Sequence, residues 1–194
     1  LHMLRATTRE VGALLVFDEV MTFRLDAGGA QAIYEVEPDL TAFAKIIGGG
    51  FPVGAFGGRR EVMVMFSPFG GTAHQSGTFN ANPVTMSAGL AAMQLLTPDE
   101  FARLNRLGER LMEGFRAGFA EAGMKGQVTG YGSMLNVHCS AAPVRDYRSA
   151  ARARKEVGAL LHLSLMNKGI FSAPRGMFAL STPMDERVID DCVV

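Results

Sequence analysis

The sequence has little of several residue types, and each shortage excludes a class of protein. It contains no tryptophan, three tyrosines and two cysteines among 194 residues. Cys139 and Cys192 stand far apart and lack metal-site spacing, so we expect reduced thiols in a cytoplasmic protein and not a disulfide framework. The four histidines form no HxxxH or HExxH pattern, and we expect no metal ion.

Charge of one sign and long hydrophobic runs are also missing. The 19 Lys and Arg residues balance 19 Asp and Glu residues without a block of like charge, so nothing favours a nucleic acid or a membrane surface as partner. The longest apolar stretches, such as ALLVF at 13–17, are far too short to span a bilayer. With 48% hydrophobic and 20% charged residues, the composition is that of a globular protein.

The apolar pattern predicts an α/β half followed by a smaller α+β half, with a boundary near residue 97. The first expected strand is continuously apolar up to its paired acids, which is typical of a parallel sheet covered on both faces. The elements expected in this half are strands at 13–20, 40–44 and 53–58 and helices at 1–12, from 59 onward, and at 82–96.

The clearest helix of the second half is expected at 97–123. Thr97 is a plausible N-cap, Pro98 stands at the first helical position, and Glu100 completes a capping box. The elements expected after it are a strand at 128–138, a helix at 147–169, a hairpin at 170–182 and a final helix from 183.

Two charged residues end strands that are expected to be neighbours. Asp18 stands at the carboxyl edge where open α/β sheets bind ligands, although such an acid can also cap a helix or form a salt bridge. Lys45 ends the apolar strand of TAFAKIIGGG; the alternative is a lysine that snorkels to the surface. A buried lysine can form a Schiff base with an aldehyde, and a carboxylate can keep a pyridine nitrogen protonated. The pair therefore indicates pyridoxal 5'-phosphate.

The phosphate of such a cofactor needs hydrogen-bond donors. The segment SGTFNANP offers Gly77 and Thr78 just ahead of a helix that begins near Asn82. Backbone amides, a hydroxyl and a helix N-terminus together form an anion site, although many loops before helices have this composition.

Three segments in this order, LLVFDEVMTFR, PDLTAFAKIIGGGFPVGAFGGRREVM and HQSGTFNANPVTMSAGLAAM, resemble class III pyridoxal-phosphate aminotransferases. The similarity is greatest to the branch of glutamate-1-semialdehyde aminomutases and β-amino-acid aminotransferases, and it covers essentially the whole chain. It implies a fold-type I α/β enzyme. Residues 1–97 would be the C-terminal part of the cofactor-binding large domain, with its mixed or parallel sheet, and residues 98–194 a small C-terminal α+β domain.

The resemblance also implies a role for each site residue. Asp18 would contact the pyridine nitrogen, Val20 would pack on the ring, and Lys45 would form the Schiff base and move the substrate's proton. Thr78, beside Gly77, would reach the cofactor phosphate of the neighbouring subunit, so that a homodimer shares its sites. Gly48 to Gly50 would let a loop turn close to the cofactor.

Two details bear on the substrate. VMTFR lacks the glycine that aminomutases usually have in V-M-T-G-F-R. FSAPRGMFALS places Arg175 where β-amino-acid aminotransferases have an arginine, which would bind the substrate carboxylate; the alternative is a surface hairpin arginine. These details favour transfer of an amino group between an amino acid, including a β-amino acid, and a keto acid. An aminomutase-type isomerase is the alternative.

Two further interpretations remain open. Family members are considerably longer, and their glycine-rich phosphate loop and ring-stacking aromatic residue lie upstream of the part that matches. We therefore expect a piece of a longer protein, which by itself would be an inactive fragment. A nucleotide-binding domain is the weakest alternative, because neither GGG nor GAFGG gives G-x-G-x-x-G between a strand and a helix.

Overall fold

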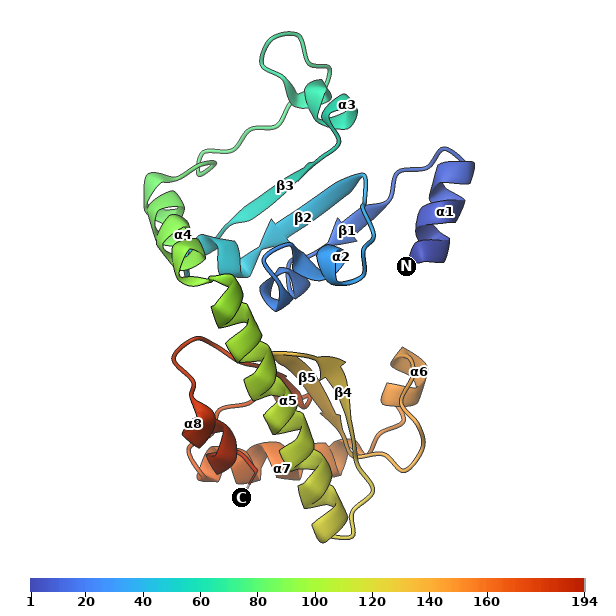
Figure 1. Ribbon diagram of the computed structural model, residues 1–194, viewed down its shortest axis with the longest axis vertical. Helices are drawn as coiled ribbons and strands as arrows, with labels where there is room; N and C mark the ends of the chain where they lie inside the picture. The colour runs from blue at the N-terminus through green and yellow to red at the C-terminus, as the bar shows by residue number, and fades with distance from the viewer. Residues whose placement is uncertain (194) are drawn as a thin grey trace. The chain divides into compact units, whose positions relative to one another are not determined.

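The computed structural model describes residues 1–193 and divides into two compact units, Leu1–Phe101 and the remainder from Ala102. The N-terminal unit contains a three-stranded sheet in the order β1 (Val16–Asp18), β2 (Leu40–Ala44), β3 (Gly54–Gly58), seen side by side in Figure 1. β1 and β2 run parallel, whereas β3 is antiparallel to β2. The sheet is therefore mixed.

The first strand differs from its prediction. It spans three residues, and Val16 is 55% exposed, so the expected coverage of both sheet faces is wrong for this strand. An apolar run indicates that a segment tends to be buried, but it does not say which part of a protein covers it.

The helices of this unit are α1 (His2–Glu10), α2 (Gly29–Ile33), α3 (Arg60–Met63) and α4 (Pro83–Leu95), with 3₁₀ turns η1 (Thr22–Leu25), η2 (Lys45–Gly48) and η3 (Val64–Phe66).

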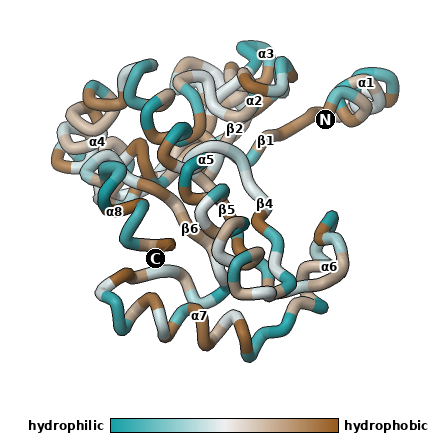
Figure 2. Tube along the Cα trace, turned by 60° about the horizontal axis from the view of Figure 1, so that its bottom comes forward, coloured by the Kyte–Doolittle hydropathy of each residue, from teal (hydrophilic) through white to brown (hydrophobic). Residues whose placement is uncertain are grey.

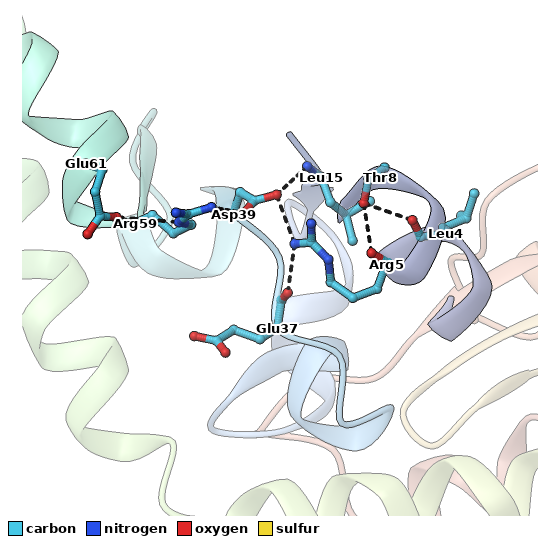
Figure 3. A network of polar contacts seen from close by, with 8 residues as sticks. All are labelled: Leu4, Arg5, Thr8, Leu15, Glu37, Asp39, Arg59 and Glu61. Atoms are coloured by element: carbon cyan, nitrogen blue, oxygen red, sulfur yellow. Dashed lines mark hydrogen bonds and ion pairs between the residues drawn. The ribbon is translucent and has the colours of Figure 1, made fainter. Parts of the chain in front are cut away.

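A buried carboxylate holds the start of β2. Asp39 accepts hydrogen bonds from the Leu15 amide at 2.7 Å, Arg5 Nη1 at 2.9 Å and Arg59 Nη1 at 3.0 Å (Figure 3). The Leu15 amide first, and then the two guanidinium groups, lower the pKa of Asp39 from 3.8 to about 2. One side chain thus ties α1 and the segments next to β1 and β3 to β2.

The C-terminal unit contains a second sheet in the order β4 (Gln127–Tyr131), β5 (Met134–His138), β6 (Met177–Ala179), with antiparallel neighbours throughout. The single strand expected at 128–138 is in fact the β4–β5 hairpin. Gly132, at φ +49°, lies in the turn that reverses the chain. The expected strand is wrong because the chain reverses at Gly132, and its two halves pair with each other.

The helices of this region are α5 (Pro98–Glu121), α6 (Tyr147–Ala150), α7 (Lys155–Asn167) and α8 (Glu186–Asp191). The helix expected at 147–169 is divided, because α6 ends before Arg152. The hairpin expected at 170–182 is also wrong: β6 is its only strand within the described chain, and β6 pairs with β5. Thr97 Oγ1 accepts from the Glu100 amide at 3.3 Å, as the predicted N-cap requires.

The two units differ in how much apolar surface they bury. In the C-terminal unit α5 packs Leu104, Leu107, Leu111 and Phe115 into a core that also contains Leu135, Val137, Leu165, Phe178, Leu180 and Ile189. The buried hydrophobic residues of the N-terminal unit are Leu15, Leu25, Val36 and Phe101. Between residues 1 and 193, no helix has the length and apolarity needed to cross a membrane.

Candidate functional site

The parallel pairing of β1 and β2 brings the two charged strand ends together. Asp18 is the last residue of β1 and is in register with Ala42, and Lys45 follows Ala44 at the end of β2. Figure 1 shows β1 and β2 side by side, and because neighbouring parallel strands end at the same edge of a sheet, Asp18 and Lys45 belong to one edge. This is the carboxyl edge, where α/β sheets bind ligands.

Asp18 is exposed and has few internal contacts. Its Oδ1 accepts a hydrogen bond from the Val20 amide at 3.0 Å, and no other side-chain bond of Asp18 is found within residues 1–193. Val20 itself is half-buried. The carboxylate therefore remains available to a cationic partner from outside this part of the chain.

Lys45 is exposed, so the burial expected from the sequence is wrong for this structure. Its φ of +51° lies in the left-handed region, which is unusual for a residue other than glycine. The chain turns there into η2 and leaves the sheet. The apolar strand before Lys45 predicted burial, but the environment of a strand end depends on what covers the sheet edge. Among the described residues the lysine amine has no hydrogen-bond or ion-pair partner.

The glycines after Lys45 serve a contact with α4. Gly49 has φ +59°, and a Cβ built on it would lie 2.2 Å from the Ala88 carbonyl oxygen. Gly89 makes the reciprocal approach, with its built Cβ 2.2 Å from the Ile47 carbonyl oxygen. Gly50 has open space around it. The close approach that the sequence indicated is thus made to a helix; an approach to a cofactor stays a prediction.

The second acid of FDEV, Glu19, has a structural role that sequence reasoning missed. It is 1% exposed and accepts hydrogen bonds from the Gln31 amide at 2.7 Å, the Ala30 amide at 3.1 Å and the Thr22 hydroxyl. The two amides belong to the first turn of α2, where a carboxylate is favoured. The glycine pair just before Ala30 was the signal that a helix begins there.

The segment predicted to bind the cofactor phosphate, around Gly77 and Thr78, offers fewer hydrogen-bond donors than the sequence indicated. Gly77 and Thr78 are exposed in a turn, and the Thr78 hydroxyl has no partner within residues 1–193. The N-terminus of α4 is already capped, because Asn82 Oδ1 accepts from the Val84 amide at 3.0 Å and the Thr85 amide at 3.3 Å. The expected contribution of free helix amides is therefore wrong, and Thr78 remains the available donor.

Arg175 lies in the C-terminal unit, in a turn closed by a hydrogen bond from the Gly176 amide to the Ala173 carbonyl at 2.9 Å. Its side chain is exposed, with Nη2 3.6 Å from Met177 Sδ. The other predicted site residues belong to the N-terminal unit.

Arg24 is a further residue near Asp18 that the sequence analysis did not select. It is half-buried in η1, and its Nε has no hydrogen-bond partner within the described chain. Burial lowers the pKa of its guanidinium. Its position six residues after Asp18, in FDEVMTFR, was the only available signal.

Comparison with known proteins gives consistent matches. The family described as Aminotransferase class-III matches residues 1–176. A glutamate-1-semialdehyde 2,1-aminomutase of Sulfurihydrogenibium sp. is 43% identical over 192 residues, which cover 97% of this chain and 45% of the relative. A β-phenylalanine transaminase of Variovorax paradoxus is 43% identical over 191 residues, covering 98% of this chain and 44% of the relative.

Solved structures agree with these matches. An ω-transaminase from Sphaerobacter thermophilus superposes with a TM-score of 0.91 at 47% identity, covering 99% of this chain and 45% of the other. The β-phenylalanine aminotransferase of Variovorax paradoxus gives a TM-score of 0.94 at 42% identity, with the same coverage. The predicted α/β fold class is thereby confirmed. The chain spans less than half the length of these relatives.

Proposed function

The chain belongs to the class-III aminotransferase family, and from this premise we propose that the whole protein moves an amino group between an amino acid and a keto acid, with pyridoxal 5'-phosphate as cofactor. The observation that carries the proposal is the placement of Asp18 and Lys45 at one edge of the β1–β2 pair. Both side chains are exposed, and neither forms an ion pair with another residue of 1–193.

The groups at this edge fit the cofactor. Pyridoxal phosphate has an aldehyde, a basic ring nitrogen and a phosphate, and the matching groups are the Lys45 amine, the Asp18 carboxylate and the Thr78 hydroxyl. When bound, the cofactor supplies an aldehyde that takes up amino groups and a ring that delocalises the electrons released at the substrate carbon.

Each residue would contribute a distinct step. The Asp18 carboxylate would accept the ring N–H and keep that nitrogen protonated, and Val20 would pack on the ring. The Lys45 Nζ would hold the aldehyde until the substrate amine displaces it, and the freed amine would then take a proton from the substrate carbon and return it to the cofactor side.

We propose that Arg175 binds the substrate carboxylate, because its planar guanidinium can donate two parallel hydrogen bonds. Its exposed position in a turn is compatible with this role. Together with the similarity to a β-phenylalanine transaminase, Arg175 supports a β-amino acid as substrate. The alternative is an aminomutase-type isomerase, which the equal identity to an aminomutase supports.

We also propose a homodimer in which Thr78 reaches the neighbouring site. Helix α4, which follows Thr78, contains no charged residue and is coloured mostly from white to brown in Figure 2. Its exposed large apolar residues are Val84, Met86, Leu90 and Leu95. A helix that is apolar on several faces is usually covered by protein.

Absorbance spectroscopy tests the cofactor assignment. Addition of pyridoxal phosphate to the protein is expected to give the visible band of lysine-bound cofactor, and Lys45→Ala is expected to lack it. Lys125→Ala, at an exposed lysine of a loop, is the matched control and keeps the band. A band that survives in Lys45→Ala would contradict the assignment.

Two further readouts separate the alternatives. Release of a keto acid that requires a separate amino acceptor indicates a transaminase, whereas an acceptor-independent shift of the amino group indicates a mutase. If the chain by itself gives no band with any variant, the interpretation as an inactive fragment is supported.

A further inference from the structure

The connection between β5 and α7, residues 139–154, forms a loop that projects from the C-terminal unit (Figures 1 and 2). We call it the α6 loop, after the short helix that it contains. Its two ends meet, because the Arg154 amide donates to the Cys139 carbonyl at 3.0 Å. The α6 loop is therefore a single excursion from the sheet with a defined base.

Hydrogen bonds hold the α6 loop in one shape. Gln127 of β4 donates from Nε2 to the Ser140 carbonyl at 3.2 Å, and its Oε1 accepts from the Val144 amide at 2.9 Å. At the start of α6, Asp146 Oδ1 accepts from the Ser149 amide at 2.7 Å, and Ser149 Oγ accepts from the Asp146 amide at 3.0 Å, which is a capping box. A surface that is already ordered loses less conformational entropy when a partner binds to it.

The exposed side chains of the α6 loop carry an excess of positive charge. Arg145, Arg148 and Arg152 are exposed, and none has a side-chain hydrogen bond or ion pair within the described chain. Arg148 and Arg152 are four residues apart across α6 and the helical turn after it, a spacing that places two side chains on one side. Asp146 is the only acid of the loop, and its carboxylate already accepts from Ser149.

An aromatic side chain lies among these cations. Tyr147 is 86% exposed and directly precedes Arg148. Arginine and tyrosine are enriched at protein–protein interfaces, whereas lysine is depleted there, and the α6 loop contains no lysine. A guanidinium binds a carboxylate through two parallel hydrogen bonds. This composition favours an acidic protein as partner.

Nucleic acids and anionic membranes fit the α6 loop less well. Both are bound mainly by extended basic surfaces in which lysine is as useful as arginine. The loop offers three unpaired arginines, in a chain whose formal net charge is zero. A short acidic peptide segment matches a surface of this size and charge.

We propose that the α6 loop is a docking surface for an acidic segment of another protein. Carboxylates of the partner pair with Arg145, Arg148 and Arg152, and an apolar side chain of the partner packs on the ring of Tyr147. This interaction goes beyond the proposed transaminase reaction and does not depend on it, because none of these four residues is assigned to the cofactor or the substrate.

Fluorescence anisotropy with a labelled peptide of glutamates around a central phenylalanine tests the proposal. Saturable binding that weakens with added salt is expected in the parent. Arg148→Gln should weaken it about threefold, because an exposed ion pair is lost, and replacement of all three arginines by glutamine should abolish it. Tyr147→Ala should weaken binding, whereas Tyr147→Phe should not. Arg116→Gln, at an exposed arginine of α5, is the matched control and should bind like the parent.

Several results would overturn the proposal. Absence of saturable binding in the parent is one, and equal affinity of the triple arginine variant and Arg116→Gln is another. Tighter binding of a single-stranded oligonucleotide or of phosphatidylserine vesicles, dependent on the same arginines, would replace the acidic protein with a nucleic acid or a membrane. Circular dichroism checks that the triple variant is folded; if it is not, Arg145→Gln and Arg152→Gln are measured singly, and each should weaken binding about threefold.

Discussion

At the residue scale, the two neighbouring acids of FDEV have opposite environments. Successive side chains of a strand point to opposite faces. Asp18 is therefore exposed at the sheet edge, while Glu19 is 1% exposed and satisfied by the first turn of α2. The acid with a free carboxylate is the candidate for chemistry, and the satisfied one stabilises the fold.

This difference gives a paired prediction. Glu19→Gln should lower the free energy of unfolding by about 1–3 kcal/mol, because a buried charged acceptor of amide hydrogen bonds is lost. Asp18→Asn should leave stability nearly unchanged but lower the transamination rate by about a hundredfold or more, because a preorganised charge is removed. Urea unfolding and steady-state rates measure the two effects, and equal destabilisation by both variants would contradict the separation of roles.

Asp39 gives a prediction of pH dependence. Its folded pKa of about 2 lies below the ordinary value of 3.8, so it stabilises the fold above pH 4. This contribution is expected to be lost as the pH falls from about 4 toward 2, since the unfolded chain binds the proton first. Thermal unfolding midpoints across this range should fall less steeply in Asp39→Asn than in the parent. An identical slope would show that other carboxylates dominate the acid response.

At the element scale, the contact of η2 with α4 depends on a glycine. Gly49→Ala should destabilise the N-terminal unit strongly, because it combines a left-handed backbone, which costs about 1–2 kcal/mol, with a built Cβ only 2.2 Å from a backbone oxygen. Gly50→Ala is the matched control, with φ +96° and no atom within 4 Å of its built Cβ, so it adds backbone strain alone. Comparable unfolding midpoints for the two variants would count against close packing of η2 on α4.

Helix α5 supplies the main apolar face of the C-terminal core. Leu104 is 1% exposed, and Leu104→Ala should cost about 2–5 kcal/mol because it leaves a cavity in a packed core. Leu163→Ala, at a residue of α7 that is 55% exposed, should change the free energy of unfolding by about 0.5 kcal/mol or less. Denaturant titrations followed by circular dichroism would measure both.

At the scale of the whole molecule, apolar surface is distributed unevenly. The N-terminal unit exposes many large apolar side chains, including those of α4, and buries few. Burial of such surface against another subunit would contribute favourably to association.

Leu90→Glu therefore tests the proposed homodimer. A charge at this α4 residue, which is 62% exposed, should convert the dimer to a monomer in analytical ultracentrifugation, because the interface would have to bury it. Leu163→Glu, on the C-terminal unit, should leave the association state unchanged. A dimer that tolerates Leu90→Glu would exclude α4 from the interface.

The sequence by itself determined the features that depend on local pattern. The sequence predicted α4 and α5 almost to their observed ends, α5 from its capping residues, and LTAFA predicted β2 correctly. The order and spacing of FDEV, AKIIGGG and the segment around Thr78 predicted the family, because this combination of residue types is rarely found by chance. These signals depend only on residues that are close together in the sequence.

Only the tertiary structure decided the features that depend on distant residues. It separated the roles of Asp18 and Glu19, showed that Lys45 is exposed, and assigned the glycine at 49 to a contact with α4. It also showed that Arg145, Arg148 and Arg152 are exposed and unpaired within the described chain. Burial and pairing at these positions depend on which elements meet in space, and a local pattern records only the tendency of a segment to be covered.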